Sequence, residues 1–230
     1  MIILSGDADS VRTLLRAEVK PGTDLSGAEL PGANLAGANL PKLDLSGANL
    51  SGANLTRANL AESDLGGCNL TRAILIGAVL TGSDLTDSNL TGADLTSAQM
   101  DNACIINADL YWAGLAGANL NGADLSQTNL AKSNLTLATL IGADLFWADL
   151  GGANLVMANL SRATLTVANL SRASLVMADL SGATLAGADL TGADLTEANL
   201  ADADLNEANL RGTNTTGANL SGVDLSKVKR

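Results

Sequence analysis

The sequence predicts an all-β solenoid that turns once every five residues. Leucine recurs at every fifth position from Leu25 to Leu225 and fills 38 of these 41 positions, the exceptions being Met100, Ile105 and Thr215. The residue two places before each of these positions is small, usually Ala, and the residue one place before is mostly Asn or Asp. No insertion or deletion interrupts this frame, so the repeat predicts one elongated domain.

A regular helix and a straight strand are both incompatible with this period. On a helix, a step of roughly 100° per residue would spread the Leu side chains around the whole circumference. On a strand, side chains alternate between faces, so an odd repeat would move Leu to the other face each time. The chain must therefore turn once per repeat. The small residue and the Leu then point inward, the Asn or Asp points outward, and the other two residues form a corner rich in typical turn residues.

Two short segments flank the repeat. In residues 1–20, apolar side chains at helical spacing predict a short amphipathic helix that caps the first coil, because a stacked repeat otherwise exposes its apolar end. A separate partner-binding helix is the alternative. Residues 21–226 contain the repeat, and residues 227–230 form a basic tail. Three interpretations of the last coil remain open: it frays, the tail folds over it, or two chains pair there.

The repeat resembles the pentapeptide-repeat family in the triplets Ala-Asn-Leu at 33–35 and Ala-Asp-Leu at 93–95, 143–145 and 188–190. The resemblance covers about nine tenths of the chain. It implies a right-handed quadrilateral β-helix of about ten coils, with four repeats per coil and often an N-terminal helical cap. At a strand spacing of about 4.8 Å, the rod is roughly 50 Å long. The Leu-rich style is similar to bacterial, especially cyanobacterial, members.

Four repeats per coil place residues 20 apart in one column. One column of outward positions is acidic, interrupted only by Cys104, Thr164 and Thr184. Either Asn and Asp interchange freely at this position, or the column is a negative stripe that mimics nucleic acid or collects cations. The stripe carries at most one charge per coil of about 4.8 Å, whereas duplex DNA carries one per about 1.7 Å. Its members are Asp24, Asp44, Asp64, Asp84, Asp124, Asp144, Asp204 and Asp224.

The corners of the middle coils carry apolar residues where polar ones are usual, and every aromatic residue of the chain is among them. We expect these side chains to point outward, because the inward positions are already occupied by Leu and Ala. They form either a protein-contact or self-association surface, or a neutral surface. The candidate contact residues are Tyr111, Trp112, Leu137, Phe146, Trp147, Val156, Met157, Val176 and Met177.

The composition argues against catalysis and cofactor binding. The chain has no His, so the usual proton shuttle and metal ligand is missing. Cys68 and Cys104 lie nearly two coils apart, about 9 Å along the axis, which is too far for a disulfide. The corner glycines form no phosphate loop, and the acidic column lacks the loop of a calcium site. We expect no catalytic, metal or cofactor site.

The net charge of −11 disfavours direct binding to nucleic acid, which needs Lys and Arg to neutralise phosphates. The absence of a signal peptide and of a long apolar stretch predicts a cytoplasmic protein without membrane contact. The expected function is that of a non-enzymatic structural or interaction protein that binds an unidentified protein through its outward faces. The resemblance also implies an alternative, a DNA-mimicking protector or inhibitor of DNA gyrase, and with it an end-to-end homodimer through the C-terminal coil. Gyrase-protecting members look richer in Phe at the position where this chain has Leu.

Overall fold

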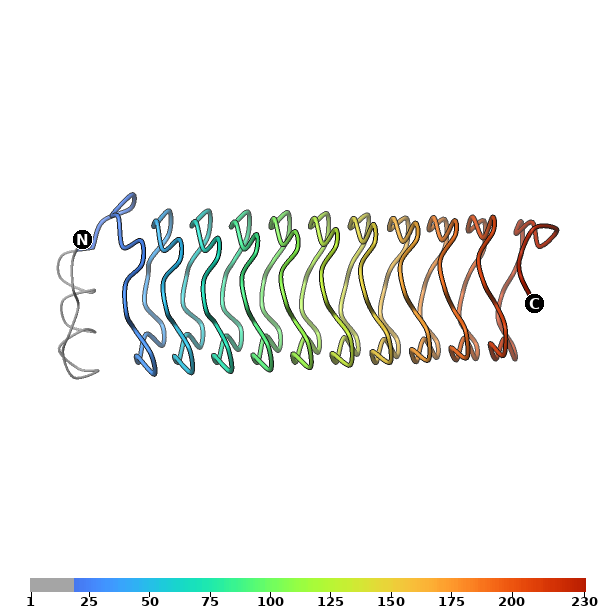
Figure 1. The fold of residues 1–230 in the computed structure, drawn as a ribbon, viewed down its shortest axis with the longest axis horizontal. Coiled ribbons are helices and arrows are strands. Elements are labelled where there is room, and N and C mark those ends of the chain that lie inside the picture. The colour runs from blue at the N-terminus through green and yellow to red at the C-terminus, as the bar shows by residue number, and fades with distance from the viewer. Residues whose placement is uncertain (1–18) are drawn as a thin grey trace.

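The computed structural model describes residues 19–230, which form a straight rod of stacked coils (Figure 1). Parallel β-bridges join residues 20 apart along the rod, from Asp24–Asp44 to Asn209–Lys229, so each coil takes four repeats. Each bridge involves single residues, and the described part of the chain contains no helix, membrane-spanning or other, and no longer strand. The predicted β-solenoid is confirmed. The predicted N-terminal cap falls almost entirely outside the described residues and remains a prediction without support.

Every repeat ends in a tight corner. The amide of Ala28 donates to the carbonyl of Leu25 at 3.0 Å, and this hydrogen bond recurs along the rod. The second corner residue has a φ between 55° and 82° at the 41 corners from Gly22 to Gly222, as in a type II turn. Twenty of these positions are Gly, which adopts a positive φ without steric cost. At the others, the side chain carries a cost of roughly 1–2 kcal/mol.

Four faces and four edges run along the rod. We number the faces by their first Leu: face 1 starts at Leu25, face 2 at Leu30, face 3 at Leu35 and face 4 at Leu40, and each continues at intervals of 20 residues. Each edge takes the number of the face that precedes it, so edge 1 contains residues 26–27 and their equivalents. Edges 1 and 3 are therefore diagonally opposite, as are edges 2 and 4.

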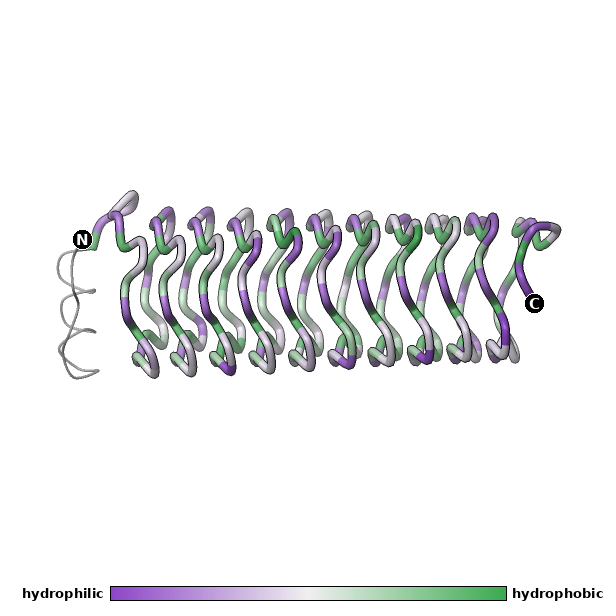
Figure 2. Tube along the Cα trace, in the orientation of Figure 1, coloured by the Kyte–Doolittle hydropathy of each residue, from purple (hydrophilic) through white to green (hydrophobic). Residues whose placement is uncertain are grey.

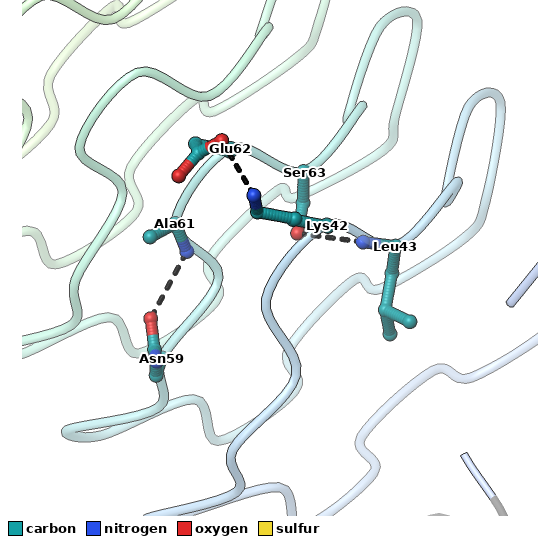
Figure 3. A network of polar contacts seen from close by, with 6 residues as sticks. All are labelled: Lys42, Leu43, Asn59, Ala61, Glu62 and Ser63. Carbon is teal, nitrogen blue, oxygen red and sulfur yellow. Dashed lines mark hydrogen bonds and ion pairs between the residues drawn. The ribbon is translucent and has the colours of Figure 1, made fainter. Parts of the chain in front are cut away.

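The core consists of the Leu and Ala columns, which are buried from the first coils to Ala208. Five buried positions of the small-residue column carry hydroxyls, and each hydroxyl donates to a backbone carbonyl, so none is left unsatisfied. Figure 3 shows one of them, Ser63, whose oxygen also accepts the amide of Leu43 at 3.1 Å. An ion pair joins two stacked corners nearby, between Lys42 and Glu62, which are 3.1 Å apart and exposed.

The core opens at the carboxyl end of the rod. Hydrophobic and hydrophilic stretches alternate in every coil (Figure 2), but Thr215 in the last coil is exposed at a core position. A hollow of about 460 Å³ lies there, lined mainly by core leucines and by Arg230. The backbone frame continues to Lys229, whose amide donates to Ala208 at 2.9 Å and whose carbonyl accepts from Leu210 at 2.7 Å. The segment expected to be a tail thus extends the last coil.

Candidate functional site

Face 1 brings seven of the eight predicted acids into one column, because the bridges stack each of its repeats from Asp24 to Asp204 on the next, whereas no bridge joins Asp204 to Asp224. The Oδ1 atom of every one of these Asp residues accepts the backbone N–H of the residue two positions later, at 2.8–3.0 Å. Asn54 and Asn129 accept the equivalent N–H on other faces, both at 3.1 Å. An Asn or Asp oxygen at this position therefore closes the corner without needing a negative charge, and the corners that follow Ile74 and Val79 form without such an oxygen.

Asn adds a donor that Asp lacks. The Nδ2 of Asn59 donates to Asn39 one coil earlier at 2.8 Å, and that of Asn169 donates to Asp149 at 2.7 Å. Face 1 has no Asn, so its carboxylates follow one another without such a donor. In the described residues, no three acidic or Cys side chains are arranged to hold a metal ion. A function for the acidic stripe remains a prediction.

The nine predicted contact residues lie on three different edges. Phe146 and Trp147 are on edge 1, Tyr111 and Trp112 on edge 2, and the remaining five on edge 3. They therefore form three separate groups and not one patch. The largest group is a strip that we call the Leu137 ladder, consisting of Leu137, Val156, Met157, Val176 and Met177.

The Leu137 ladder spans three consecutive coils. The amide of Leu137 donates to the carbonyl of Val156 at 3.0 Å, and that of Met157 donates to Val176 at 2.9 Å, so neighbouring corners are joined directly. Leu137, Met157 and Met177 occupy the second corner position with φ of 60°, 58° and 57°. Their exposed fractions are 56 %, 50 % and 52 %. Apolar side chains are thus held outward in a backbone conformation that favours Gly.

The aromatic residues form two smaller groups. On edge 1, the rings of Phe146 and Trp147 are nearly parallel, with an interplanar angle of 6° and centroids 6.0 Å apart. On edge 2, the ammonium of Lys132 lies 5.7 Å from the ring centroid of Tyr111, within the range of a cation–π interaction. Trp112 beside it is 70 % exposed, the highest value among the exposed large apolar residues.

Sequence reasoning missed the Lys and Arg residues of edge 2. Arg72, Lys132, Arg172 and Arg211 all lie on this edge and are exposed. The sequence contains the signal, because an interval of 20 residues places all of these Lys and Arg residues except Arg211 in one column and Arg211 beside it.

The two Cys residues differ in their surroundings. Cys68 is buried in the core, and its thiol donates to the carbonyl of Leu45 at 2.9 Å. Burial raises the pKa of the Cys68 thiol to about 12, so it remains protonated and a poor nucleophile at neutral pH. Cys104 is half-buried on face 1, 3.3 Å from the hydroxyl of Thr86. Neither thiol lies beside a basic group that would activate it within the described residues.

Comparison with known proteins places the chain in a family. The family model of pentapeptide repeats matches in eight copies over residues 22–57, 53–92, 73–110, 108–145, 143–176, 173–212 and 203–229. No curated protein sequence matches significantly. Among solved structures, HetL from the cyanobacterium Nostoc sp. strain PCC 7120, a pentapeptide repeat protein involved in heterocyst differentiation regulation, is 34 % identical. The similarity covers 94 % of this chain and 95 % of HetL, with a TM-score of 0.82.

A second solved structure shares the fold at lower similarity. QnrB1, a plasmid-mediated fluoroquinolone resistance protein, is 20 % identical over 89 % of this chain and 91 % of its own, with a TM-score of 0.55. At this identity the likeness concerns the fold alone. The repeat frame, the four-sided coil and the family match agree over nearly the whole described rod, and the chain therefore belongs to the pentapeptide-repeat family.

Proposed function

We propose that this protein is a non-enzymatic rod that binds a partner protein through exposed side chains on its edges. The observation that carries the proposal is the Leu137 ladder, in which three apolar side chains occupy left-handed corner positions and remain half exposed. The inward positions fill the core, and the outward Asn and Asp close the corners. Neither filling the core nor closing the corner requires the side chains of the two corner residues.

The energetics favour a functional reason for these residues. A side chain at a left-handed φ costs roughly 1–2 kcal/mol relative to the right-handed region, and the cost is largest for residues other than Gly, Asn and Asp. Exposed Leu and Met also add nothing to solubility. Gly at the same position, as at 20 other corners, avoids both disadvantages. Contact with a partner would recover this free energy by burying apolar surface.

The similarity to HetL supports a regulatory binding role. It spans nearly the whole of both chains, so the same long surface is available in both proteins. HetL is described as involved in heterocyst differentiation regulation. We extend to this chain a role in regulation, and we propose that the rod performs it by contact with another protein.

Gyrase protection by DNA mimicry is the second candidate, and it has less support. Its basis here would be the acidic column of face 1, but those carboxylates close their own corners. A supercoiling assay with purified DNA gyrase, with and without a quinolone, tests this candidate. Inhibition or quinolone protection at micromolar protein would favour mimicry over the edge-binding proposal.

The edge-binding proposal is tested by capturing partners from extracts of cells that express the chain natively, with quantitative mass spectrometry. The variant Leu137→Ser, Met157→Ser, Met177→Ser removes the apolar surface of the ladder. The control Asn107→Ser, Gln127→Ser changes two polar residues at equivalent left-handed positions of edge 1. We expect at least one captured protein whose recovery is unchanged with the control variant and falls at least about tenfold with the ladder variant. Equal recovery by both variants would refute the ladder as a contact surface.

A further inference from the structure

The Leu137 ladder lies on a stretch of the rod surface that carries acids and no cation. From residue 133 to residue 220, faces 3 and 4 and the edge between them contain three charged side chains, and all three are acids. Arg162 and Arg172 lie on the neighbouring edges 4 and 2, and neither forms an ion pair in residues 19–230. Negative charge therefore lies beside the last coil of the ladder and beyond it. The three acids are Asp179, Asp194 and Glu197.

These acids keep their charge in the folded rod. The hydroxyl and the amide of Thr196 both donate to Oδ1 of Asp194, the amide at 3.0 Å, and these hydrogen bonds lower the pKa of the Asp194 carboxyl group. Glu197 occupies the second corner position one coil after Met177, with a φ of 58°, and is exposed. A carboxylate that accepts hydrogen bonds from its own corner remains ionised at neutral pH, so it still attracts a cation.

The backbone of the ladder is closed to an added strand. The amides of Leu137, Met157 and Met177 donate to carbonyls of the next corner at 2.9–3.0 Å. The amide of Val156 donates to the side chain of Asn154 at 3.1 Å. Strand addition needs a row of free N–H and C=O groups, so an extended segment placed here would leave polar backbone groups unpaired against apolar side chains. A helix pairs these groups internally.

The spacing of the ladder matches that of contact residues on a helix. Leu137, Met157 and Met177 follow one another at intervals of one coil, about 4.8 Å, so the outer two positions are about 10 Å apart. Residues i, i+3 or i+4 and i+7 of a helix lie on one side, and with a rise of about 1.5 Å per residue the outer two are about 10.5 Å apart. The following helical turn reaches the coil of Glu197.

We propose that the Leu137 ladder and the acids beside it bind a basic amphipathic helix of a partner protein, which lies along the rod. Three apolar residues of this helix, at i, i+3 or i+4 and i+7, each contact one coil of the ladder. Lys or Arg residues on the following turn lie against Asp194 and Glu197. Amphipathic helices are commonly recognised in this way, and Met side chains adapt to the surface that they meet. The inference rests on the proposed protein-binding function and adds the conformation and charge of the partner.

The charge of this surface distinguishes the basic helix from other occupants. A nucleic acid or an anionic membrane surface would be repelled by the acids and by the net charge of −11. A second copy of the chain carries the same net charge, and its residues 19–230 contain no helix. An acidic helix would meet like charges at Asp194 and Glu197.

A fluorescein-labelled peptide serves as the probe. It is a model helix built from Leu, Ala and Lys, with Leu at i, i+3, i+4 and i+7 on one side and Lys on the other. Binding is measured by fluorescence polarisation. Far-ultraviolet circular dichroism measures the helix signal gained on mixing, which reports the peptide because residues 19–230 of the protein contain no helix. One control peptide has the same composition with Leu distributed around the helix, and another has Glu in place of Lys.

We expect the basic amphipathic peptide to bind, to gain helix signal and to dissociate in part as salt is raised. The Leu137 ladder variant should weaken binding at least about tenfold. The variant Asp194→Asn, Glu197→Gln should weaken it about fivefold. The matched variant Asp204→Asn, Glu207→Gln changes the same two positions of a repeat on the diagonally opposite side of the rod and should change binding less than about twofold. Asn keeps the oxygen that closes each corner, so the thermal melts of both variants should match the wild type.

Five outcomes would overturn the inference. These are equal weakening by both acid variants, unchanged binding by the ladder variant, equal binding of a control peptide, binding without a gain in helix signal, and absence of binding at millimolar peptide. Self-association that the ladder variant abolishes would assign the ladder to a second copy of the chain and would likewise exclude the helix.

The capture experiment separates this inference from the proposed function. A captured protein that depends on the ladder, together with a failure of the peptide, would refute the helix and retain the proposed function. Equal recovery of every captured protein with the ladder variant and its control would refute the proposed function itself.

Discussion

The cost of placing a side chain at the second corner position can be measured at Gly142. This residue has a φ of 64°, and an added Cβ would meet no atom within 4 Å. A substitution there consequently changes the backbone strain without creating a clash. Gly142→Val introduces a β-branched residue, for which a positive φ is least favourable, whereas Gly142→Asn introduces one of the residues that tolerate it.

The expected magnitude follows from two opposing effects. The left-handed conformation costs a residue with a Cβ roughly 1–2 kcal/mol. Replacing Gly restricts the unfolded chain and returns roughly 0.4–1 kcal/mol. For Gly142→Val the net loss in the free energy of unfolding is therefore about 1 kcal/mol, which corresponds to a fall of roughly 2–4 °C in Tm for a chain of this size. For Gly142→Asn the two effects cancel to within about 0.5 kcal/mol.

Thermal and urea denaturation followed by circular dichroism measure both variants against the wild type. Equal stability of the Val and Asn variants would show that the left-handed corners carry no cost for large side chains. The positions of Leu137, Met157 and Met177 would then need no functional explanation, and the main support for the proposed function would be lost. A clear difference between the two variants retains that support.

Three further predictions concern the thiols, the acids and the surface ion pair. Native protein should react with a thiol reagent at Cys104 and not at Cys68, whose raised pKa and burial protect it, and both should react in denaturant; equal native reactivity would contradict the buried placement. Hydrogen bonds lower the pKa of the carboxylates of Asp24, Asp194 and Asp224 from the ordinary 3.8, so the ionised form of each stabilises the fold. The Tm should therefore fall between about pH 5 and pH 3, which a series of thermal melts at different pH values measures. A constant Tm over this range would contradict the expected sign. Glu62→Gln should change the free energy of unfolding by less than about 1 kcal/mol because Lys42 and Glu62 are both exposed, and urea titration would reveal a larger loss.

The core could be predicted from the repeat alone. An odd period excludes both a helix and a straight strand, so the Leu column had to be the inner wall of a turning chain. The buried Leu column confirms this, including Met100 and Ile105, which keep the apolar character and the volume of the column. The interval of 20 residues came from the family resemblance, since five-residue corners by themselves do not set the number of corners per coil.

The placement of Gly in the sequence also indicates the conformation at the corners. Of the 24 Gly residues in the chain, 20 occupy the second corner position, as expected where φ must be positive. Gly is therefore enriched at the second corner position and not at the first, which distinguishes two positions that otherwise both carry typical turn residues. The end of the rod could not be predicted in this way. Lys229 pairs with Asn209 through backbone groups, which follow the frame of the chain whatever the side chain is.

The fold determines where a function can reside. In each repeat, two side chains fill the core, and where the third is Asn or Asp its oxygen closes the corner, which leaves the two corner side chains free to vary. The second of these carries a conformational cost that Gly escapes and that Asn and Asp tolerate best among the other residues. Large residues on this position are therefore the most informative residues of the chain, because the fold does not require them and in part resists them. The Leu137 ladder, Trp112 and Lys132 all meet this condition.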